Sequence, residues 1–133
     1  MKNKKIPLFK VFTDKKKAQS IVGQVLDSGF LNEGVYVNKL SKKLKNFLNV
    51  KNIVLMNSCT SALTIAMKLS GLKPGKNIVT TPVTCIASNT PIKNLGGKVK
   101  WADVDTETGM LSQETIKKVI DKSTVAVLIV NWS

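Results

Sequence analysis

Apolar residues in the first fifty positions recur at helical spacing, which predicts two amphipathic helices. Asp14 can cap a helix that runs to about Ser28, because its carboxylate can accept hydrogen bonds from the N–H groups of the first turn. A second helix is predicted over residues 37–48, with lysines opposite its apolar face. Glycines bracket the loop between them. Residues 1–51 are therefore expected to form an N-terminal arm and two helices.

From Asn52 onwards the pattern changes to short apolar runs that alternate with helical segments. The runs predict four buried strands, at residues 52–56, 78–81, 98–104 and 124–131. Helices are predicted between them, at residues 58–70, 84–95 and 114–121. This alternation is typical of an α/β fold with a mostly parallel sheet, right-handed crossovers and flanking helices. Residues 52–133 are therefore expected to form an α/β domain.

Individual residues predict where the helices of this domain begin and end. Gly71 is expected to stop the helix over 58–70, and Ser112 is expected to cap the helix over 114–121. Pro91 should kink the helix over 84–95 or end it early, because proline lacks the N–H and its ring clashes with the preceding turn.

The composition narrows the class of protein. The chain has 133 residues, of which 43% are hydrophobic, enough for a compact domain with a core. We find neither a run of ~18 apolar residues, as a membrane-spanning helix needs, nor a signal-peptide pattern, so we expect a soluble cytoplasmic protein without a membrane partner. Cys59 and Cys85 form no C-x-x-C pair and histidine is absent, so no metal site is expected.

The net charge of +13 raises the question of nucleic-acid binding. All 21 basic residues are lysines, so the arginine forks that favour guanine and phosphate recognition are absent. Twelve of the lysines lie in residues 1–51 and the others are spread along the chain. We therefore do not expect nucleic acid to be the main partner. A basic binding module stays an alternative, beside a lysine-rich surface that only faces water.

A candidate ligand site follows the first predicted strand. In parallel α/β sheets, ligands bind beyond the C-terminal ends of the strands. Asn57 and Ser58 stand at this position, and Cys59, Thr60 and Ser61 open the next helix. Small hydroxyl residues at the positive end of a helix leave N–H groups that suit a phosphate. They suit an ordinary N-terminal cap equally well, and the sequence contains neither G-x-G-x-x-G nor a Walker A lysine.

Two carboxylates, Asp103 and Asp105, follow the third predicted strand. Such a pair could bind a cation or act as acid and base. It more often belongs to a turn, in which Asp105 would start the turn and Gly109 would close it. We favour the turn.

An ordered set of stretches resembles the DegT/DnrJ/StrS family of sugar aminotransferases, which are pyridoxal phosphate (PLP) enzymes of fold type I. Asn57-Ser58-Cys59-Thr60-Ser61-Ala62-Leu63 is similar to the family's N-S-G-T-A-A-L. The other stretches are residues 6–8, 28–34 with the helix over 37–48, 72–75, 81–84, 87–89, 97, 101–105, 108–109, 123–126 and 130–132. The resemblance covers essentially the whole chain, and implies that residues 52–133 are an incomplete PLP-binding large domain.

The resemblance also implies roles for four residues. Cys59, Thr60 and Ser61 would hold the PLP phosphate through backbone and hydroxyl groups. Cys85 would lie against the cofactor ring, where many members have an aromatic residue. Cys59 stands where the family has glycine, so strain is expected if this position needs an unusual φ. Lys76-Asn77 replaces the usual Asp-Glu, and we expect this change to have little effect.

The implied reaction is amino transfer from glutamate to a keto-sugar nucleotide, in a homodimer. The Schiff-base lysine and the carboxylate at the pyridine nitrogen lie beyond residue 132 in the family, so no catalytic residue is assigned. Residues 1–133 are expected to be an inactive N-terminal part, whether a fragment, a split gene product or a truncation. The alternatives are a non-catalytic remnant that binds PLP weakly or pairs with a longer homologue, and the basic module.

Overall fold

The computed structural model describes residues 6–7 and 9–131. The predicted arm falls partly, and Trp132 wholly, outside these residues. Contacts divide the chain into two units, Met1–Leu55 and Met56–Ser133, which are described separately. The division that the sequence predicts after residue 51 stays a prediction.

The first unit contains two helices, α1 (Lys15–Ser28) and α2 (Val35–Leu48). Asp14 caps α1 as predicted, because its side chain accepts a hydrogen bond from the N–H of Lys17. Gly29 ends the helix with a φ of 70°, a left-handed conformation that glycine adopts without a steric penalty. Neither helix contains a buried residue, so their apolar stripes are only partly covered within the described part of the chain.

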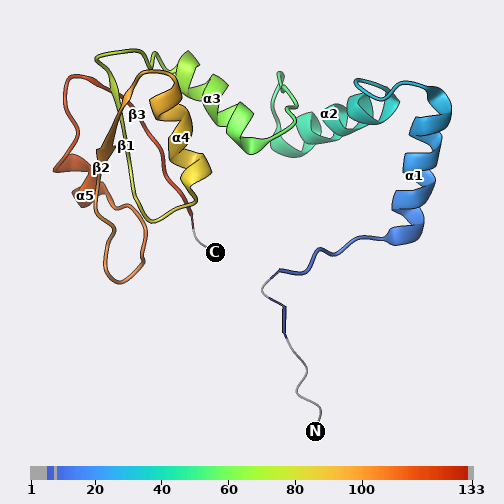
Figure 1. Ribbon diagram of the computed structural model, residues 1–133, viewed down its shortest axis with the longest axis horizontal. Helices are drawn as coiled ribbons and strands as arrows, with labels where there is room; N and C mark the ends of the chain where they lie inside the picture. Colours follow the sequence, from blue (N-terminus) through green and yellow to red (C-terminus); the bar gives the residue numbers. More distant parts are fainter. Residues whose placement is uncertain (1–5, 8, 132–133) are drawn as a thin grey trace, which may run out of the picture. The chain divides into compact units, whose positions relative to one another are not determined.

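The second unit holds a three-stranded sheet (Figure 1). Its strands are β1 (Asn77–Thr80), β2 (Lys98–Trp101) and β3 (Thr124–Val127). They lie in the order β2-β1-β3, and both pairs are parallel. The parallel sheet with flanking helices confirms the predicted α/β fold class. β1 is central, and all four of its residues are buried.

The first predicted strand, residues 52–56, is wrong for this structure: the segment has no strand pairing. Val54 is 81% exposed and Met56 is 43% exposed. An apolar run becomes a strand only where a neighbour completes its backbone hydrogen bonds, and none of the three described strands does so here.

Three helices accompany the sheet: α3 (Cys59–Leu69), α4 (Ile86–Asn94) and α5 (Gln113–Lys117). α3 and α4 pack together, and α4 packs on β1 and β2. The core between these elements contains the side chains of Met67, Leu72, Ile78 and Ile92. No helix among the described residues is both long and apolar enough to cross a bilayer.

Several boundaries differ from the predicted ones. β2 ends at Trp101 rather than at residue 104, because the chain then enters the turn around Asp105. α5 ends at Lys117 rather than at residue 121, and β3 ends at Val127 rather than at 131. Pairing with β1 sets the ends of β2 and β3, whereas the apolar pattern of the sequence continues beyond them.

Pro91 neither ends nor shortens α4, which continues to Asn94. Pro91 itself is buried, and its carbonyl accepts a hydrogen bond from the N–H of Leu95. Because proline has no N–H, α4 lacks only the hydrogen bond that this position would otherwise donate to the carbonyl of Ala87. Burial against the core offsets this loss.

Candidate functional site

The candidate site lies at the C-terminal edge of the parallel sheet. α4 follows β1 and runs back toward the start of β2, so it begins at the edge where β1 ends, and α3 packs against α4 (Figure 1). Cys85, which precedes α4, therefore lies at this edge, and Cys59–Ser61 open the helix that packs against α4. The four predicted site residues all belong to the second unit.

The start of α3 is a closed hydrogen-bonded cap. Ser58 Oγ accepts from the N–H of Ser61 at 3.1 Å, and the two hydroxyl oxygens lie 2.8 Å apart. Ser61 Oγ donates to Asn57 Oδ1 at 3.0 Å. The ordinary cap that the sequence allowed is thus present, and both the N–H and the hydroxyl proton of Ser61 are engaged in it.

Cys59 and Thr60, unlike Ser61, have hydrogen-bonding groups that the cap does not use. Their N–H groups occupy the first two positions of α3, which have no acceptor within a helix. No hydrogen bond of the Thr60 hydroxyl is found in the described part of the chain, and its carbonyl accepts from Thr64. Two N–H groups and one hydroxyl at the positive end of the helix therefore face outward, which suits an anion.

The glycine-to-cysteine change causes no strain at Cys59. Asn49 is the residue other than glycine that has a positive φ among those described, and Cys59 lies in regular helix. The conditional expectation of strain therefore does not apply.

Cys85 forms the N-terminal boundary of α4, with an extended conformation of φ −63° and ψ 135°. Its side chain makes no capping hydrogen bond, and both Cys85 and Cys59 are exposed free thiols. Cys85 can therefore present sulfur to a planar ligand at this edge.

Asn89, whose role the sequence did not indicate, holds this edge together. Its Oδ1 accepts from the hydroxyl of Thr80 and its Nδ2 donates to the carbonyl of Thr81, both at 3.1 Å. All three residues are buried. A buried amide with both ends satisfied orients the two elements that carry it, so the pair fixes α4 against the end of β1. An asparagine within the helix predicted over 84–95 was the available signal.

The Asp103–Asp105 pair forms the predicted turn. Asp105 Oδ1 accepts from the N–H of Glu107 and from the N–H and hydroxyl of Thr108, and the N–H of Gly109 bonds to the Asp105 carbonyl. The N–H and hydroxyl of Thr108 lower the pKa of Asp105 from its ordinary value. Asp103 accepts from the N–H of Val104. These bonds account for the pair without a cation or a catalytic role.

Asn77 has a structural role in the second unit. Asn77 is 6% exposed, and its Nδ2 donates to Ser123 Oγ at 2.7 Å and to Asp121 Oδ1 at 3.1 Å. Asp121 is also paired with Lys100, whose ammonium holds the pKa of this carboxyl well below its ordinary range, with help from Ser123 and Asn77. This network joins the beginnings of β1 and β3, at the edge opposite the candidate site, and is structural.

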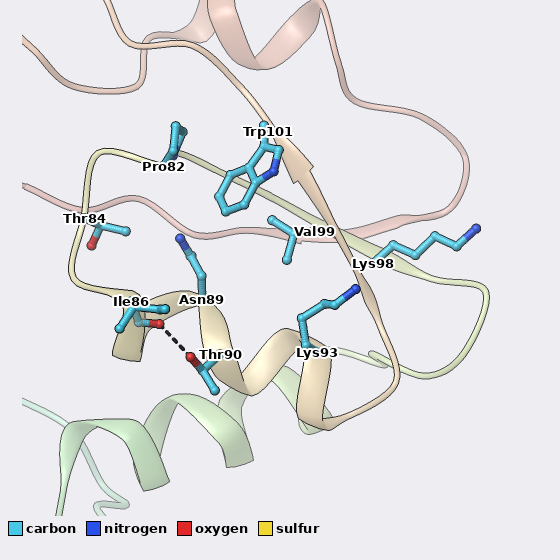
Figure 2. A pocket seen from close by; sticks show the side chains of 9 residues that line it. All are labelled: Pro82, Thr84, Ile86, Asn89, Thr90, Lys93, Lys98, Val99 and Trp101. Carbon is cyan, nitrogen blue, oxygen red and sulfur yellow. Dashed lines mark hydrogen bonds between the residues drawn. The ribbon is translucent and has the colours of Figure 1, made fainter.

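A separate groove of about 770 Å³ lies between α4 and β2 (Figure 2). Cys59, Thr60, Ser61 and Cys85 are not among its lining residues. The groove is therefore distinct from the predicted phosphate site.

Sequence comparison decides the family. The model of the DegT/DnrJ/EryC1/StrS aminotransferase family matches residues 13–133. This chain belongs to that family. The resemblance inferred from the ordered motifs is confirmed, and the fold agrees with it.

Two curated relatives illustrate the range of the family. The chain is 32% identical over 111 residues to the spore coat polysaccharide biosynthesis protein SpsC of Bacillus subtilis (strain 168), covering 84% of this chain and 28% of SpsC. It is 28% identical over 127 residues to the GDP-perosamine synthase of Vibrio cholerae, covering 95% of this chain and 34% of that enzyme. The chain thus spans about a third or less of these relatives.

A solved structure supports the fold. GDP-4-keto-6-deoxymannose-3-dehydratase, solved with a trapped PLP-glutamate geminal diamine, matches 94% of this chain and 34% of its own chain, with a TM-score of 0.81. The sequence identity is 24%, so the match shows the aminotransferase fold alone.

Proposed function

We propose that this chain supplies the phosphate-binding part of a cytoplasmic, homodimeric PLP-dependent aminotransferase that moves an amino group from glutamate to a keto-sugar nucleotide. Family membership supports the aminotransferase activity. A relative named as a GDP-perosamine synthase, and a fold neighbour trapped with PLP and glutamate, support the substrate class and the cofactor. The observation that supports the site is the exposed start of α3, where the N–H groups of Cys59 and Thr60 have no acceptor within the helix.

The residues at this edge fit the cofactor. The N–H groups of Cys59 and Thr60 and the Thr60 hydroxyl would bind the phosphate. Ser61 would add its hydroxyl only by giving up its bond to Asn57, so in this proposal Ser61 mainly shapes the cap. Cys85 would contact the ring through sulfur, held in place by the Asn89 bonds that anchor α4.

When bound, PLP supplies an electron sink that activates the amino group for transfer. The contribution of these residues is to bind and orient the phosphate end. The family takes the lysine that bonds the cofactor, and the carboxylate at its ring nitrogen, from sequence beyond residue 132. We therefore propose that residues 1–133 alone bind the cofactor weakly and do not transaminate.

The test measures phosphate-end binding with pyridoxine 5′-phosphate, which lacks the aldehyde and cannot react with the many lysines. Calorimetry should show saturable 1:1 binding of this compound, and inorganic phosphate should compete with it for the site. Cys59→Pro removes one N–H while keeping α3, because proline is favoured at the first helical position after an extended residue such as Ser58. Binding should fall roughly tenfold or more, the loss expected for one hydrogen bond to a charged group.

Gln113→Pro is the matched control, since Gln113 is the first residue of α5 and also follows an extended capping serine. It should leave binding unchanged. Equal binding by wild type and Cys59→Pro, or binding that phosphate does not compete, would contradict the proposed site.

A further inference from the structure

The outer edge of β2 is unpaired in the described structure. β2 lies at the end of the sheet order and pairs with β1 alone. The N–H groups of Lys98 and Ala102 donate to the Lys76 and Thr80 carbonyls across this pair. In a parallel ladder alternate residues bond to the same neighbour, so the backbone groups of Val99 and Trp101 face the open edge.

The groove of about 770 Å³ runs beside this edge (Figure 2). Val99 and Trp101 come from β2, and Ile86, at the start of α4, also lines the groove. Trp101 is 50% exposed and Ile86 is 80% exposed. An extended chain placed along β2 would cover apolar side chains and complete backbone hydrogen bonds at the same time.

The charge of the groove selects the kind of chain. Lys93 and Lys98 line it, and its lining contains no carboxylate. In the described residues neither ammonium forms an ion pair, whereas Lys100, also in β2, is paired with Asp121. Asn89 and Thr90, which also line the groove, are already hydrogen-bonded within the fold. The two lysines are therefore the charged groups available to recognise a ligand, and they favour a negative one.

We infer that the edge of β2 and its groove bind an extended acidic segment of a partner protein, added as a further strand. Its alternate apolar side chains would enter the groove over Val99 and Trp101, and its carboxylates would meet Lys93 and Lys98. Lysines on an edge strand also prevent unwanted pairing between sheets. If the lysines had only this protective role, an acidic strand would not bind selectively. Experiment can therefore separate protection from binding. The inference is independent of the cofactor proposal.

The test uses a fluorescein-labelled hexapeptide that alternates glutamate with valine, and measures anisotropy with the full chain. Saturable 1:1 binding is expected. A peptide with lysine in place of glutamate should bind about tenfold more weakly, the effect expected when two exposed ion pairs are lost. N-methylation of alternate amides should also weaken binding, because it blocks strand addition along one edge.

Two protein variants test the geometry. Lys93→Gln combined with Lys98→Gln should weaken binding of the acidic peptide about tenfold, whereas Lys42→Gln combined with Lys43→Gln, an equal charge change on α2, should not. Val99→Pro removes an N–H that faces away from β1, a position where a strand tolerates proline, and should weaken binding of the acidic peptide because that N–H can no longer donate to a peptide carbonyl.

Circular dichroism checks that each variant folds, and the lysine pair keeps the test decisive if Val99→Pro does not. Equal binding of the glutamate and lysine peptides would overturn the inference. So would equal loss in both lysine-pair variants, or binding that N-methylation leaves intact. Binding of indole-3-acetate as tight as that of the peptide would assign the groove to small anions instead, and would also overturn it.

Discussion

The hydroxyl of Thr80, at the end of β1, donates a 3.1 Å hydrogen bond to Oδ1 of Asn89 in α4. Asn89 returns a bond to the Thr81 carbonyl at the same distance. These two hydrogen bonds bridge the segment that contains Cys85, and Thr80 is fully buried. The position of the candidate ring contact therefore depends on a side chain that would touch no cofactor.

Replacing Asn89 with leucine should lower the free energy of unfolding by about 1–3 kcal/mol, because the Thr80 hydroxyl and Thr81 carbonyl would be left buried without partners. Chemical denaturation of Asn89→Leu and wild type measures the difference. Asn94→Ala, at the exposed end of the same helix, is the control and should change little. A loss as large for Asn94→Ala would mean that α4 is sensitive to any change of asparagine.

Gly97→Ala should destabilise the second unit by about 1–3 kcal/mol through overpacking. A Cβ at Gly97 would lie 2.5 Å from Cδ1 and 2.8 Å from Cγ of Leu72, whose side chain is buried in the core with only 1% exposure. Thermal unfolding monitored by circular dichroism measures the loss.

Gly23→Ala is the contrasting control, because nothing lies within 4 Å of a Cβ placed there. As a helical glycine in α1 it should gain about 0.5–1 kcal/mol. If both variants were neutral, the Gly97–Leu72 contact would not restrict this position.

The Asp121 network should make folding stability depend on pH in the acid range. Lys100 and the donors from Ser123 and Asn77 lower the folded-state pKa of Asp121, so the folded state binds its proton less readily than the unfolded chain. The stabilisation is complete above the unfolded pKa of about 3.9, and falls as the pH drops from there toward the folded pKa.

Asp121→Asn should therefore lower the melting temperature at pH 7 and reduce its fall between about pH 5 and pH 3. Melting curves across this range test both effects. Asp27→Asn, at an exposed aspartate in α1, should leave the pH profile unchanged. An Asp121→Asn profile parallel to that of wild type would show that other carboxylates control acid unfolding.

Residues 1–133 alone should show no turnover of glutamate with a keto-sugar nucleotide. Treatment with PLP and borohydride should label several surface lysines partially, because there are 21 and the proposed phosphate site would hold the cofactor only weakly. Peptide mapping distinguishes scattered from specific labelling. Stoichiometric labelling of one lysine, accompanied by turnover, would show that the placement of the site is wrong.

The isolated chain should associate in solution. Large apolar side chains of the first unit are exposed, including Leu26 at 62%, Leu31 at 67% and Phe47 at 85%. Exposed apolar area of this kind favours contact with another copy. Size-exclusion chromatography with light scattering should give a mass above that of the 14.5 kDa monomer. A monodisperse monomer of high thermal stability would contradict this expectation.

Much of the fold follows from local chemistry that the sequence displays. Asp14, Ser58 and Ser112 each precede a helix and cap it, because their oxygens accept hydrogen bonds from nearby N–H groups. Asp105 makes its turn through bonds to residues two and three positions away. Contacts this short in sequence can be inferred from the residues alone, as could the parallel sheet from the spacing of its apolar runs.

What only the tertiary structure decided depends on contacts between residues far apart in the chain. Residues 53–56 are as apolar as β1, but within the described structure they have no neighbouring strand to complete their hydrogen bonds. Asn77 resembles a surface residue in the sequence, yet Asp121 and Ser123, more than forty positions away, make it part of the core. A periodic pattern records which face of an element is apolar, but it does not record which element lies opposite. The pairing of β1 with its neighbours and the orientation of α4 therefore emerged only once the chain was folded.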